Sequence, residues 1–352
     1  MLFIIAITSV ITTLVCFLAS KTDSVELNRG KIIEMGWGTP TPIYIRDHIQ
    51  EMQQIPLDGI VIGFADNENR NIFGNSLWGA KTVNIDDYSQ SVEAIKNTQF
   101  GRFTENFLRF NVMPGEIDWH DENFKSVIKN ARLAAQVAKS GGLKGVLLDV
   151  EHYQGKPFCY LSQPERLEHS FREYQQKVRQ RGRQFIRAIN EAYPDIKILL
   201  TFGYHIAYVE RKSLQQANYG LLPSFLNGIL EGSLANTLIF DGWEFSYGYK
   251  TEEQFQEAYE TIHQKGLERT NVKEDFIDHY RASFGLWIDV GQVWQPNNYS
   301  ENYFTPEQFE DSLRFALNHT DGYVWIYSQK ARWWDGKMPK PYIDALTKAK
   351  HP

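Results

Sequence analysis

The chain alternates short apolar runs with longer amphipathic stretches from about residue 30 to the C-terminus. Apolar runs of roughly four to eight residues are typical of parallel strands with both faces buried. The stretches between them have the periodicity of helices that bury one face. We therefore predict strands at residues 32–36, 58–64, 107–112, 144–153, 196–203, 242–247, 283–289 and 322–327. The clearest predicted helices cover residues 44–54, 123–139, 164–192, 252–264 and 306–318.

Eight strand–helix alternations predict an α/β fold, a closed (β/α)8 or TIM barrel, as a single domain over residues 21–352. No glycine-rich phosphate loop follows the first strand, which disfavours a dinucleotide-binding fold. Residues 65–101, which include Trp78, are expected to form a long irregular loop after strand two. This loop and residues 113–121 after strand three are expected at the end of the barrel that carries active sites.

Five of the predicted strands begin with a glycine, and this gives a common reference for height in the barrel. Measured from these glycines, Asp149 and Asp289 lie at the same height, Glu151 lies one step higher and Glu244 one step lower. Side chains alternate faces along a strand, so an error of one residue in this alignment would move a side chain from the barrel interior to the helix side. The reference glycines are Gly59, Gly145, Gly242, Gly285 and Gly322.

Residues 2–19 are apolar or hydroxyl-bearing and carry no charge, and small residues precede Lys21. This pattern is typical of an export signal in residues 1–20, and it predicts a secreted, periplasmic or cell-surface protein. An uncleaved anchor and a lipid-modified Cys16 stay open as alternatives. The membrane would then be contacted only through residues 2–19. Removal of the segment leaves Cys159 as the one cysteine, so no internal disulfide is expected.

Net charge and aromatic content narrow the class of partner. The 352 residues carry a formal charge of -6, which argues against nucleic acid and anionic membrane surfaces as main partners. Aromatic residues make up 14% of the chain, and many lie at predicted strand ends. Flat rings there can pack against the apolar faces of a sugar. We therefore expect a carbohydrate as the partner.

The fourth predicted strand ends in two carboxylates, Asp149 and Glu151. Because side chains alternate along a strand, both point the same way at the end where parallel sheets carry chemistry. A buried carboxylate needs a partner or a use, since its desolvation costs several kcal/mol. Two carboxylates this close raise one pKa, which suits a general acid near neutral pH. Glu151 is the predicted general acid/base, and Asp149 either orients it or acts directly.

Hydrolysis of a glycosidic bond usually needs a second carboxyl group across the cleft. Asp289 at the end of strand seven and Glu244 on strand six are the two candidates, and the sequence leaves both open. A loop cap for Asp289 and a salt bridge inside the barrel for Glu244 are the structural alternatives. The predicted substrate-binding side chains are Trp37, His205, Tyr247, Trp287, Trp325 and Tyr327.

Other catalytic chemistries have weak support. The densest group of possible metal ligands is Asp118, His120 and Asp121, and a solvated loop explains it equally well. The nucleophile elbow of serine hydrolases does not occur in the sequence. Cys159 has no histidine near it in the predicted loop. We therefore expect neither a metal nor another cofactor.

The acidic strand ending, the barrel alternation and the aromatic last strand resemble the (β/α)8-barrel glycoside hydrolases. In chitinase-like members the fourth strand carries Asp-Gly-x-Asp-x-Asp-x-Glu, and Gly145, Asp149 and Glu151 match this pattern. Lys144 and Leu147 stand at its first two acidic positions. A second resemblance is to barrels with the acid on strand four and the nucleophile on strand seven, which would correspond to Glu151 and Asp289. No single family is matched.

The resemblance implies an exported glycoside hydrolase that cleaves a poly- or oligosaccharide with two carboxyl groups. Two alternatives remain open. A non-catalytic barrel that binds glycans would have the aromatic side chains without a working carboxyl pair. A metal-assisted phosphodiesterase would lose its activity to chelators, whereas a two-carboxylate glycosidase would keep it.

Overall fold

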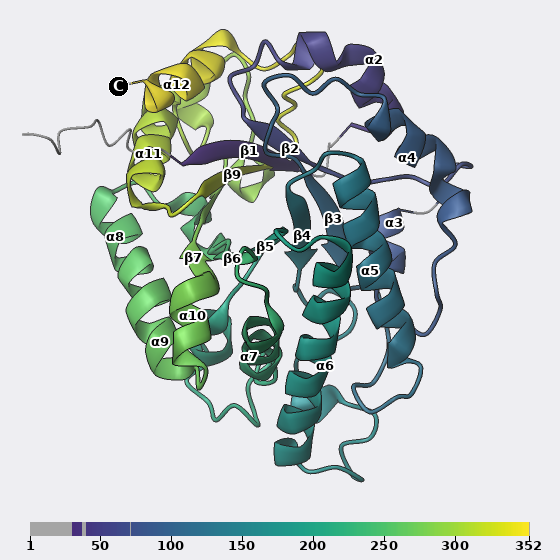
Figure 1. The fold of residues 1–352 in the computed structure, drawn as a ribbon. Helices are drawn as coiled ribbons and strands as arrows, with labels where there is room; N and C mark the ends of the chain where they lie inside the picture. Colours follow the sequence, from purple (N-terminus) through teal and green to yellow (C-terminus); the bar gives the residue numbers. More distant parts are fainter. Residues whose placement is uncertain (1–29, 37–39, 71, 352) are drawn as a thin grey trace, which may run out of the picture.

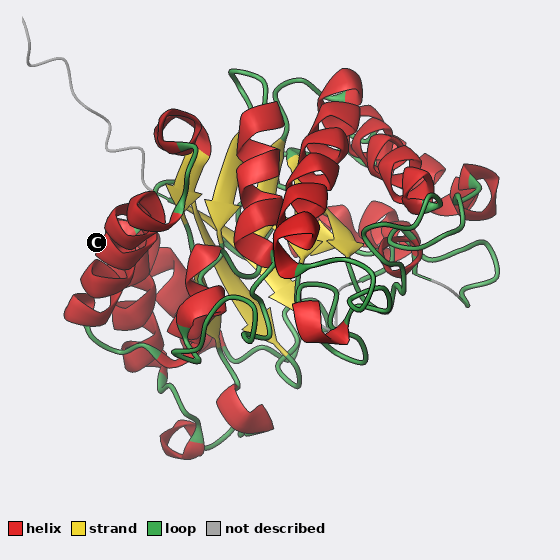
Figure 2. Ribbon diagram, turned by 90° about the horizontal axis from the view of Figure 1, so that it is seen from below, coloured by secondary structure: helices red, strands yellow, loops and turns green. Residues whose placement is uncertain are grey.

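The computed structural model describes residues 30–36, 40–70 and 72–351, so residues 1–20 and Trp37 lie outside the described part of the chain. The described residues form a single-domain (β/α)8 barrel, in which helices surround parallel strands (Figure 1, Figure 2). The predicted fold class is confirmed. Within these ranges no helix is both long and apolar enough to cross a membrane.

The strands form one parallel sheet in the order β7-β6-β5-β4-β3-β2-β1-β9-β8. Only Ser283 separates β7 from β8, and the two pair with β6 and β9 respectively. They are therefore two parts of the seventh barrel strand, and this split strand closes the barrel. The bounds are β1 Lys31–Gly36, β2 Gly59–Ile62, β3 Phe107–Asn111, β4 Gly145–Asp149, β5 Lys197–Leu200, β6 Leu238–Asp241, β7 Tyr280–Ala282, β8 Phe284–Trp287 and β9 Tyr323–Ser328.

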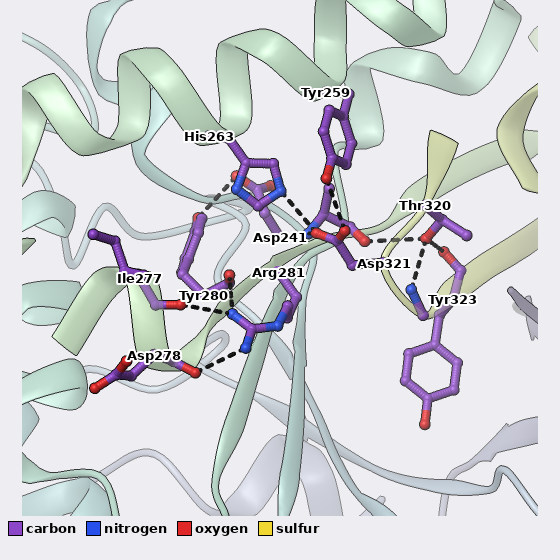
Figure 3. Close-up of polar contacts among 12 residues, drawn as sticks. Asp241, Tyr259, His263, Ile277, Asp278, Tyr280, Arg281, Thr320, Asp321 and Tyr323 are labelled. Carbon is purple, nitrogen blue, oxygen red and sulfur yellow. Dashed lines mark hydrogen bonds and ion pairs between the residues drawn. The ribbon is translucent and has the colours of Figure 1, made fainter. Parts of the chain in front are cut away.

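A polar cluster joins the split strand to the start of β9 (Figure 3). The carboxylate of Asp321 accepts hydrogen bonds from the backbone N–H of Ala282 at 2.7 Å and from the hydroxyl of Tyr259 at 3.0 Å. His263 Nε2 lies 2.7 Å from the same carboxylate. Burial alone would raise the pKa of Asp321, but these hydrogen bonds outweigh it and lower the pKa. The cluster thus fastens the seam at which the barrel closes.

Helices cover the outside of the barrel; most lie in the connections between successive strands, and the last one follows β9 (Figure 1). The amphipathic stretches predicted as helices are confirmed, with ends that shift by a few residues. The helix predicted over 164–192 begins later, at Phe171, where Ser170 and Glu173 form a capping box. The bounds are α2 Pro42–Met52, α3 Phe73–Ser76, α4 Ser89–Lys96, α5 Phe124–Ser140, α6 Phe171–Ala192, α7 Leu222–Gly232, α8 Glu252–Glu260, α9 Gly266–Arg269, α10 Lys273–His279, α11 Pro306–His319 and α12 Lys340–Lys350.

One predicted strand is wrong. Residues 242–247 are not the sixth strand, because β6 ends at Asp241 and Glu244–Gly248 form a 3-10 helix. The Asp241 carboxylate accepts a hydrogen bond from the backbone N–H of Trp243 at 3.1 Å, so Asp241 caps a turn. Asp241-Gly242 lies at the end of a strand, whereas the same dipeptide at residues 58–59 and 321–322 lies at the start of β2 and β9. Gly242 is therefore not a valid reference for height, and the position assigned to Glu244 was wrong.

The connection between β2 and β3 is long, as predicted, but it is not irregular throughout. It contains α3 and α4, and the latter packs against α2. Trp78 is 2% exposed and contacts the rings of Phe110, Trp119 and Phe225 in the layer between sheet and helices. Around Trp78, the predicted loop is therefore part of the hydrophobic core.

The barrel interior holds a smaller hydrophobic core, separate from the layer under the helices. It contains Leu147 from β4, Phe240 from β6 and Trp325 from β9. Because side chains alternate, the inward positions of β4 are Leu147 and then Asp149. This alternation places the polar ends of the strands directly above the apolar interior.

Candidate active site

A pocket of about 380 Å³ lies at the carboxyl ends of the strands, above the interior core. This is the end of the barrel at which TIM-barrel enzymes carry their active sites. The pocket brings together residues from six barrel strands or the loops that follow them. Its lining residues are Met35, Arg109, Asp149, Glu151, Tyr153, Glu244, Tyr247, Trp287, Tyr327 and Gln329.

The segment after β4 contributes three polar side chains to the pocket, at alternate positions. Asp149 is almost completely buried, and its carboxylate accepts hydrogen bonds from the backbone N–H of Glu151 at 3.0 Å and from the hydroxyl of Tyr153 at 3.1 Å. Tyr153 also hydrogen-bonds Glu151. Asp149 and Tyr153 therefore hold Glu151 in place from two sides.

Glu244 reaches the same pocket from the turn after β6. The ladder pairs Leu148 with Leu200 and Leu200 with Asp241, so Glu151 and Glu244 each lie three residues beyond the same level of the sheet. Glu244 is thus at the height of Glu151 and not below it. The turn is unusual, since Trp243 has a left-handed backbone with φ of 42°. Non-glycine residues adopt this conformation at a cost, and such residues cluster at functional sites.

Two further contacts hold this turn in its strained form. The hydroxyl of Ser246 lies 2.8 Å from the backbone oxygen of Trp243 and 2.9 Å from that of Gly285, and it accepts from the Gly285 N–H at 3.1 Å, which fastens the turn to β8. Trp325 Nε1 donates to the oxygen of Gly242 at 2.8 Å. Trp325 is fully buried, so its place is below the pocket, supporting the turn that carries Glu244.

The carboxyl groups of Glu151 and Glu244 are hydrogen-bonded to each other. Burial and then the charge of Asp149 raise the pKa of Glu151 to about 7. Burial and then the charge of Glu151 raise the pKa of Glu244 to about 9. Glu244 Oε2 is buried and faces no donor among the described residues. A proton on Glu244 accounts for its hydrogen bond with Glu151, because a protonated carboxyl group can donate to an ionised neighbour.

Arg109 is the cation of this site, and it lies at an inward position of β3. Burial raises the pKa values of both Asp149 and Glu151, and the charge of Arg109 offsets part of this increase. The charge of Arg109 therefore favours ionised Glu151, while Glu244 keeps the proton.

Three aromatic side chains form one wall of the pocket. The rings of Tyr247 and Tyr327 are stacked, with centroids 5.4 Å apart and an angle of 18°. Trp287 meets both rings edge-on, at 5.7 and 5.6 Å, and it pairs with Tyr327 across β8 and β9. Tyr247 also hydrogen-bonds Glu244. These predicted binding residues therefore lie together beside the carboxyl pair.

Asp289 lies outside the pocket lining and is fully buried. Its carboxylate accepts hydrogen bonds from Trp287 Nε1 at 2.6 Å and from the backbone N–H groups of Gln329, Lys330 and Ala331 at 2.5–3.1 Å. These contacts fasten the loop after β9 and orient Trp287. The arrangement matches the loop-cap alternative for Asp289.

His205 also lies away from the pocket lining. Its ring packs against Trp243 and Phe245, and its Nδ1 lies 3.0 Å from the guanidinium of Arg269. Burial and then the charge of Arg269 lower the pKa of His205 to about 4. His205 thus supports the turn after β6 from outside.

The sequence reasoning did not identify Arg109, Tyr153, Met35 or Gln329 as pocket residues. Two of these had a signal. Arg109 is a charged residue inside an otherwise apolar strand, and Tyr153 follows Glu151 by two positions, on the same side. Met35 and Gln329 carried no such signal, because their positions depend on the barrel closing between β1 and β9.

No protein-family model and no curated protein matches the chain. Among solved structures it is similar to a glycoside hydrolase family 5 enzyme from Prevotella bryantii B14, solved with a xyloglucan tetradecasaccharide. The TM-score is 0.51 at 12% identity, over 92% of this chain and 96% of that one. A GH5-4 broad specificity endoglucanase from Clostridium longisporum gives a TM-score of 0.51 at 10% identity, over 89% and 87% of the two chains. The chain therefore shares the barrel fold of these glycoside hydrolases, as its sequence pattern predicted.

Proposed function

We propose that the protein is a glycoside hydrolase and that Glu151 and Glu244 are its catalytic carboxyl pair. One observation carries the proposal: two carboxyl groups from different strands share a hydrogen bond in a pocket with an aromatic wall. Glycosidases need one proton-donating and one ionised carboxyl group on either side of the scissile bond. The barrel fold shared with glycoside hydrolases is compatible with this chemistry but does not assign it.

Glu244 is the proton donor in this mechanism. Its raised pKa keeps it protonated at neutral pH, while the charge of Arg109 favours ionised Glu151. The sequence alone favoured Glu151 as the acid, whereas we propose Glu244, because burial raises its pKa further than that of Glu151. Asp149 keeps its predicted supporting role, because its carboxylate orients the backbone of Glu151 and the hydroxyl of Tyr153. Asp289 has no part in the chemical step.

The closeness of the pair favours retention of the anomeric configuration. Inverting enzymes keep their carboxyl groups roughly 6.5–9.5 Å apart to hold a water molecule between base and sugar. Hydrogen-bonded carboxyl groups leave no such space. In the first step Glu151 bonds to the anomeric carbon, the glycosidic C–O bond breaks, and Glu244 gives its proton to the leaving oxygen. In the second step Glu244 takes a proton from water, the water oxygen bonds to the anomeric carbon, and the bond from that carbon to the Glu151 carboxylate breaks, which releases the sugar.

The substrate is an oligo- or polysaccharide, bound with a sugar face against Tyr247, Trp287 and Tyr327. We also propose that the protein is exported, on the basis of residues 2–19. Determination of the N-terminal residue of the protein recovered from its producing cells tests this. A mature N-terminus near residue 21 supports export with cleavage, and an intact Met1 on a cytosolic protein contradicts export.

A screen on polysaccharides and aryl glycosides tests the proposed reaction. Reducing-end release should occur in the wild type and should fall strongly in both Glu151→Gln and Glu244→Gln. Glu257→Gln, on the exposed side of α8, is the matched control and should keep full activity. With a good leaving group such as dinitrophenol, Glu244→Gln should recover most of its activity and Glu151→Gln should not, since only the acid becomes dispensable. The anomer first formed, followed by NMR, tests retention.

Binding of a glycan without release, in wild type and variants alike, would instead make the protein a glycan-binding barrel. Release that disappears with a chelator and survives both Gln substitutions would favour metal-assisted chemistry. Either result contradicts the carboxyl-pair proposal.

A further inference from the structure

A second group of side chains, away from the proposed catalytic pair, has the composition of a metal site. His120 lies in the loop between β3 and α5, and Glu165 and His169 lie in the loop between β4 and α6. Their nearest ligand atoms all lie within 4.8 Å of one another. The three residues come from loops that are 45 residues apart in the sequence and that meet only in the fold.

We propose that His120, Glu165 and His169 bind a divalent transition-metal ion, with Zn²⁺ as the best match. Two imidazoles and one carboxylate form a ligand set that zinc accepts, with a fourth position left for water or another ligand. Hard cations such as Mg²⁺ and Ca²⁺ prefer oxygen ligands and fit this set less well.

His120 is held for this role by its surroundings. Its Nε2 is buried and has no hydrogen-bond partner among the described residues, which is unusual for a polar side-chain atom. Asp118 accepts from the backbone N–H of His120 at 2.8 Å and from the hydroxyl of Tyr174 at 2.6 Å. The Tyr174 ring meets the His120 ring edge-on at 4.8 Å. A bound metal ion would give this nitrogen a partner, with the nitrogen as its ligand.

Glu165 and His169 are placed by the same network. The backbone N–H of Glu165 contacts the Asp118 carboxylate at 3.4 Å, and the oxygen of His169 accepts from the Tyr160 hydroxyl at 3.1 Å. His169 Nε2 lies 3.5 Å from Glu165 Oε2. Asp118 therefore contacts both loops that supply the ligands.

Binding requires one local change. The rings of His120 and His169 are stacked 3.7 Å apart with an angle of 10°, so their nitrogen lone pairs run parallel and do not converge on one point. His169 can turn, because its side chain is 31% exposed and it lies in a loop just before α6. Zinc–nitrogen bonds are about 2.0–2.1 Å long, so ligand atoms that lie up to 4.8 Å from one another must also approach by up to roughly 1.5 Å.

The charges around the cluster favour a cation. Glu165 lines a neighbouring cavity of about 420 Å³ together with Glu116, Asp118 and Asp121, and Lys156 is the one basic residue in that lining. Lys177 and Glu173 also act electrostatically on His120, with opposite signs. Because Glu165 lines this cavity, the open coordination position of the ion would lie on the side of the cavity.

A metal here would join the loops after β3 and β4, and the second of these also carries Tyr153 above Asp149 and Glu151. The ion would therefore stabilise the loop beside the proposed catalytic pair without contacting it. This inference does not depend on the proposed hydrolase function, and failure of either leaves the other standing.

Titration of Zn²⁺ into the untagged protein tests the site, with calorimetry and a competing chelator as readouts. We expect one equivalent to bind and to raise Tm. His120→Ala and His169→Ala should each weaken binding by at least about 100-fold, and Asp118→Asn by about 10- to 100-fold as an orienting group. His48→Ala, on α2, is the matched control and should bind as the wild type does.

Two results would overturn the proposal: no stoichiometric Zn²⁺ binding by the wild type, or unchanged binding by both His120→Ala and His169→Ala. Glu165→Gln covers the case in which His120→Ala does not fold, because it removes a ligand at a partly exposed position. Unchanged Zn²⁺ affinity in folded Glu165→Gln and His169→Ala would also contradict the site.

Discussion

The two ends of the barrel treat their buried carboxyl groups in opposite ways. At the amino-terminal end, Glu105 accepts from the Tyr323 hydroxyl at 2.7 Å and has Lys144 at 3.6 Å and Lys197 at 3.9 Å. At the carboxyl-terminal end, Asp149, Glu151 and Glu244 share a pocket with Arg109 as the cation that offsets burial. At the amino-terminal end two lysines neutralise the Glu105 carboxylate. At the carboxyl-terminal end three carboxyl groups face one arginine, so one of them binds a proton.

This difference distinguishes a carboxyl group with a structural role, such as Glu105, from candidates for acid–base catalysis. Desolvation of a carboxylate costs several kcal/mol unless partners compensate it, and the cations and hydroxyl around Glu105 do so. Without full compensation a carboxyl group binds a proton instead, as raised pKa values of Glu151 and Glu244 indicate. Groups with such shifts are candidates for acid–base catalysis.

The largest expected effect is on activity at the carboxyl-terminal end. Glu151→Gln and Glu244→Gln should each lower kcat/KM by a factor of about 100 to 10,000, because each removes one half of the proposed acid–base pair. Steady-state kinetics on the substrate found in the screen measures the loss. Losses below about tenfold in both variants would remove the pair from the mechanism.

The same Glu244→Gln variant should gain stability at high pH. The pKa of Glu244 is raised on folding, so its protonated form favours the native state at low pH, and this advantage is lost as pH rises from its ordinary value of 4.5 towards about 9. Denaturant unfolding at pH 6 and pH 9 should therefore show a smaller decline for the variant than for the wild type. An equal decline in both would show that Glu244 is ionised without cost.

Asp289 sharpens the comparison, because it lies near the pocket end but is compensated as Glu105 is. Asp289→Asn should lower the free energy of unfolding by about 3 kcal/mol, since backbone N–H donors lose a charged acceptor. Activity of the folded variant should stay within tenfold of the wild type. A loss above about 100-fold in activity with unchanged stability would instead make Asp289 a catalytic residue.

Glu105→Gln should lower the free energy of unfolding by about 2 kcal/mol and leave kcat/KM unchanged within twofold. In this variant Tyr323 donates to a neutral amide in place of a carboxylate, and Lys144 and Lys197 lose the negative charge that they pair with. Urea denaturation and kinetics on one preparation give both numbers. A large loss of activity at this residue would show that the two ends of the barrel are coupled.

The smallest effect concerns pH. Ionised Glu151 and protonated Glu244 coexist between pH values of about 7 and about 9, so kcat/KM should fall on either side of this window. Arg109→Met should move the acid limb upward by about one pH unit, because the cation lowers the pKa of Glu151. Lys197→Met, at the other end, is the control and should leave the limb in place. If the acid limb does not move in Arg109→Met, the charge of Arg109 does not affect the pKa of Glu151.

Much of the fold followed from local pattern. Strand β4 was predicted in its place, although it ends at Asp149 and not beyond Glu151, because apolar runs and alternation depend on near neighbours in the chain. Strand β6 was misplaced because the Asp-Gly of residues 241–242 has the same letters as those that begin strands, although here it ends one. Only the surroundings of a turn, such as the contacts of Trp243, decide between these uses.

The sequence by itself determined the barrel, the end of it at which Asp149 and Glu151 lie, and the strand that leads to them. The tertiary structure alone decided that Glu244 meets Glu151, that Asp289 caps a loop, and that His120 meets His169. The physical reason is the range of the interactions. Periodicity and alternation act over a few residues, whereas a shared proton or a candidate metal site depends on groups that only the closed barrel brings within a few ångströms.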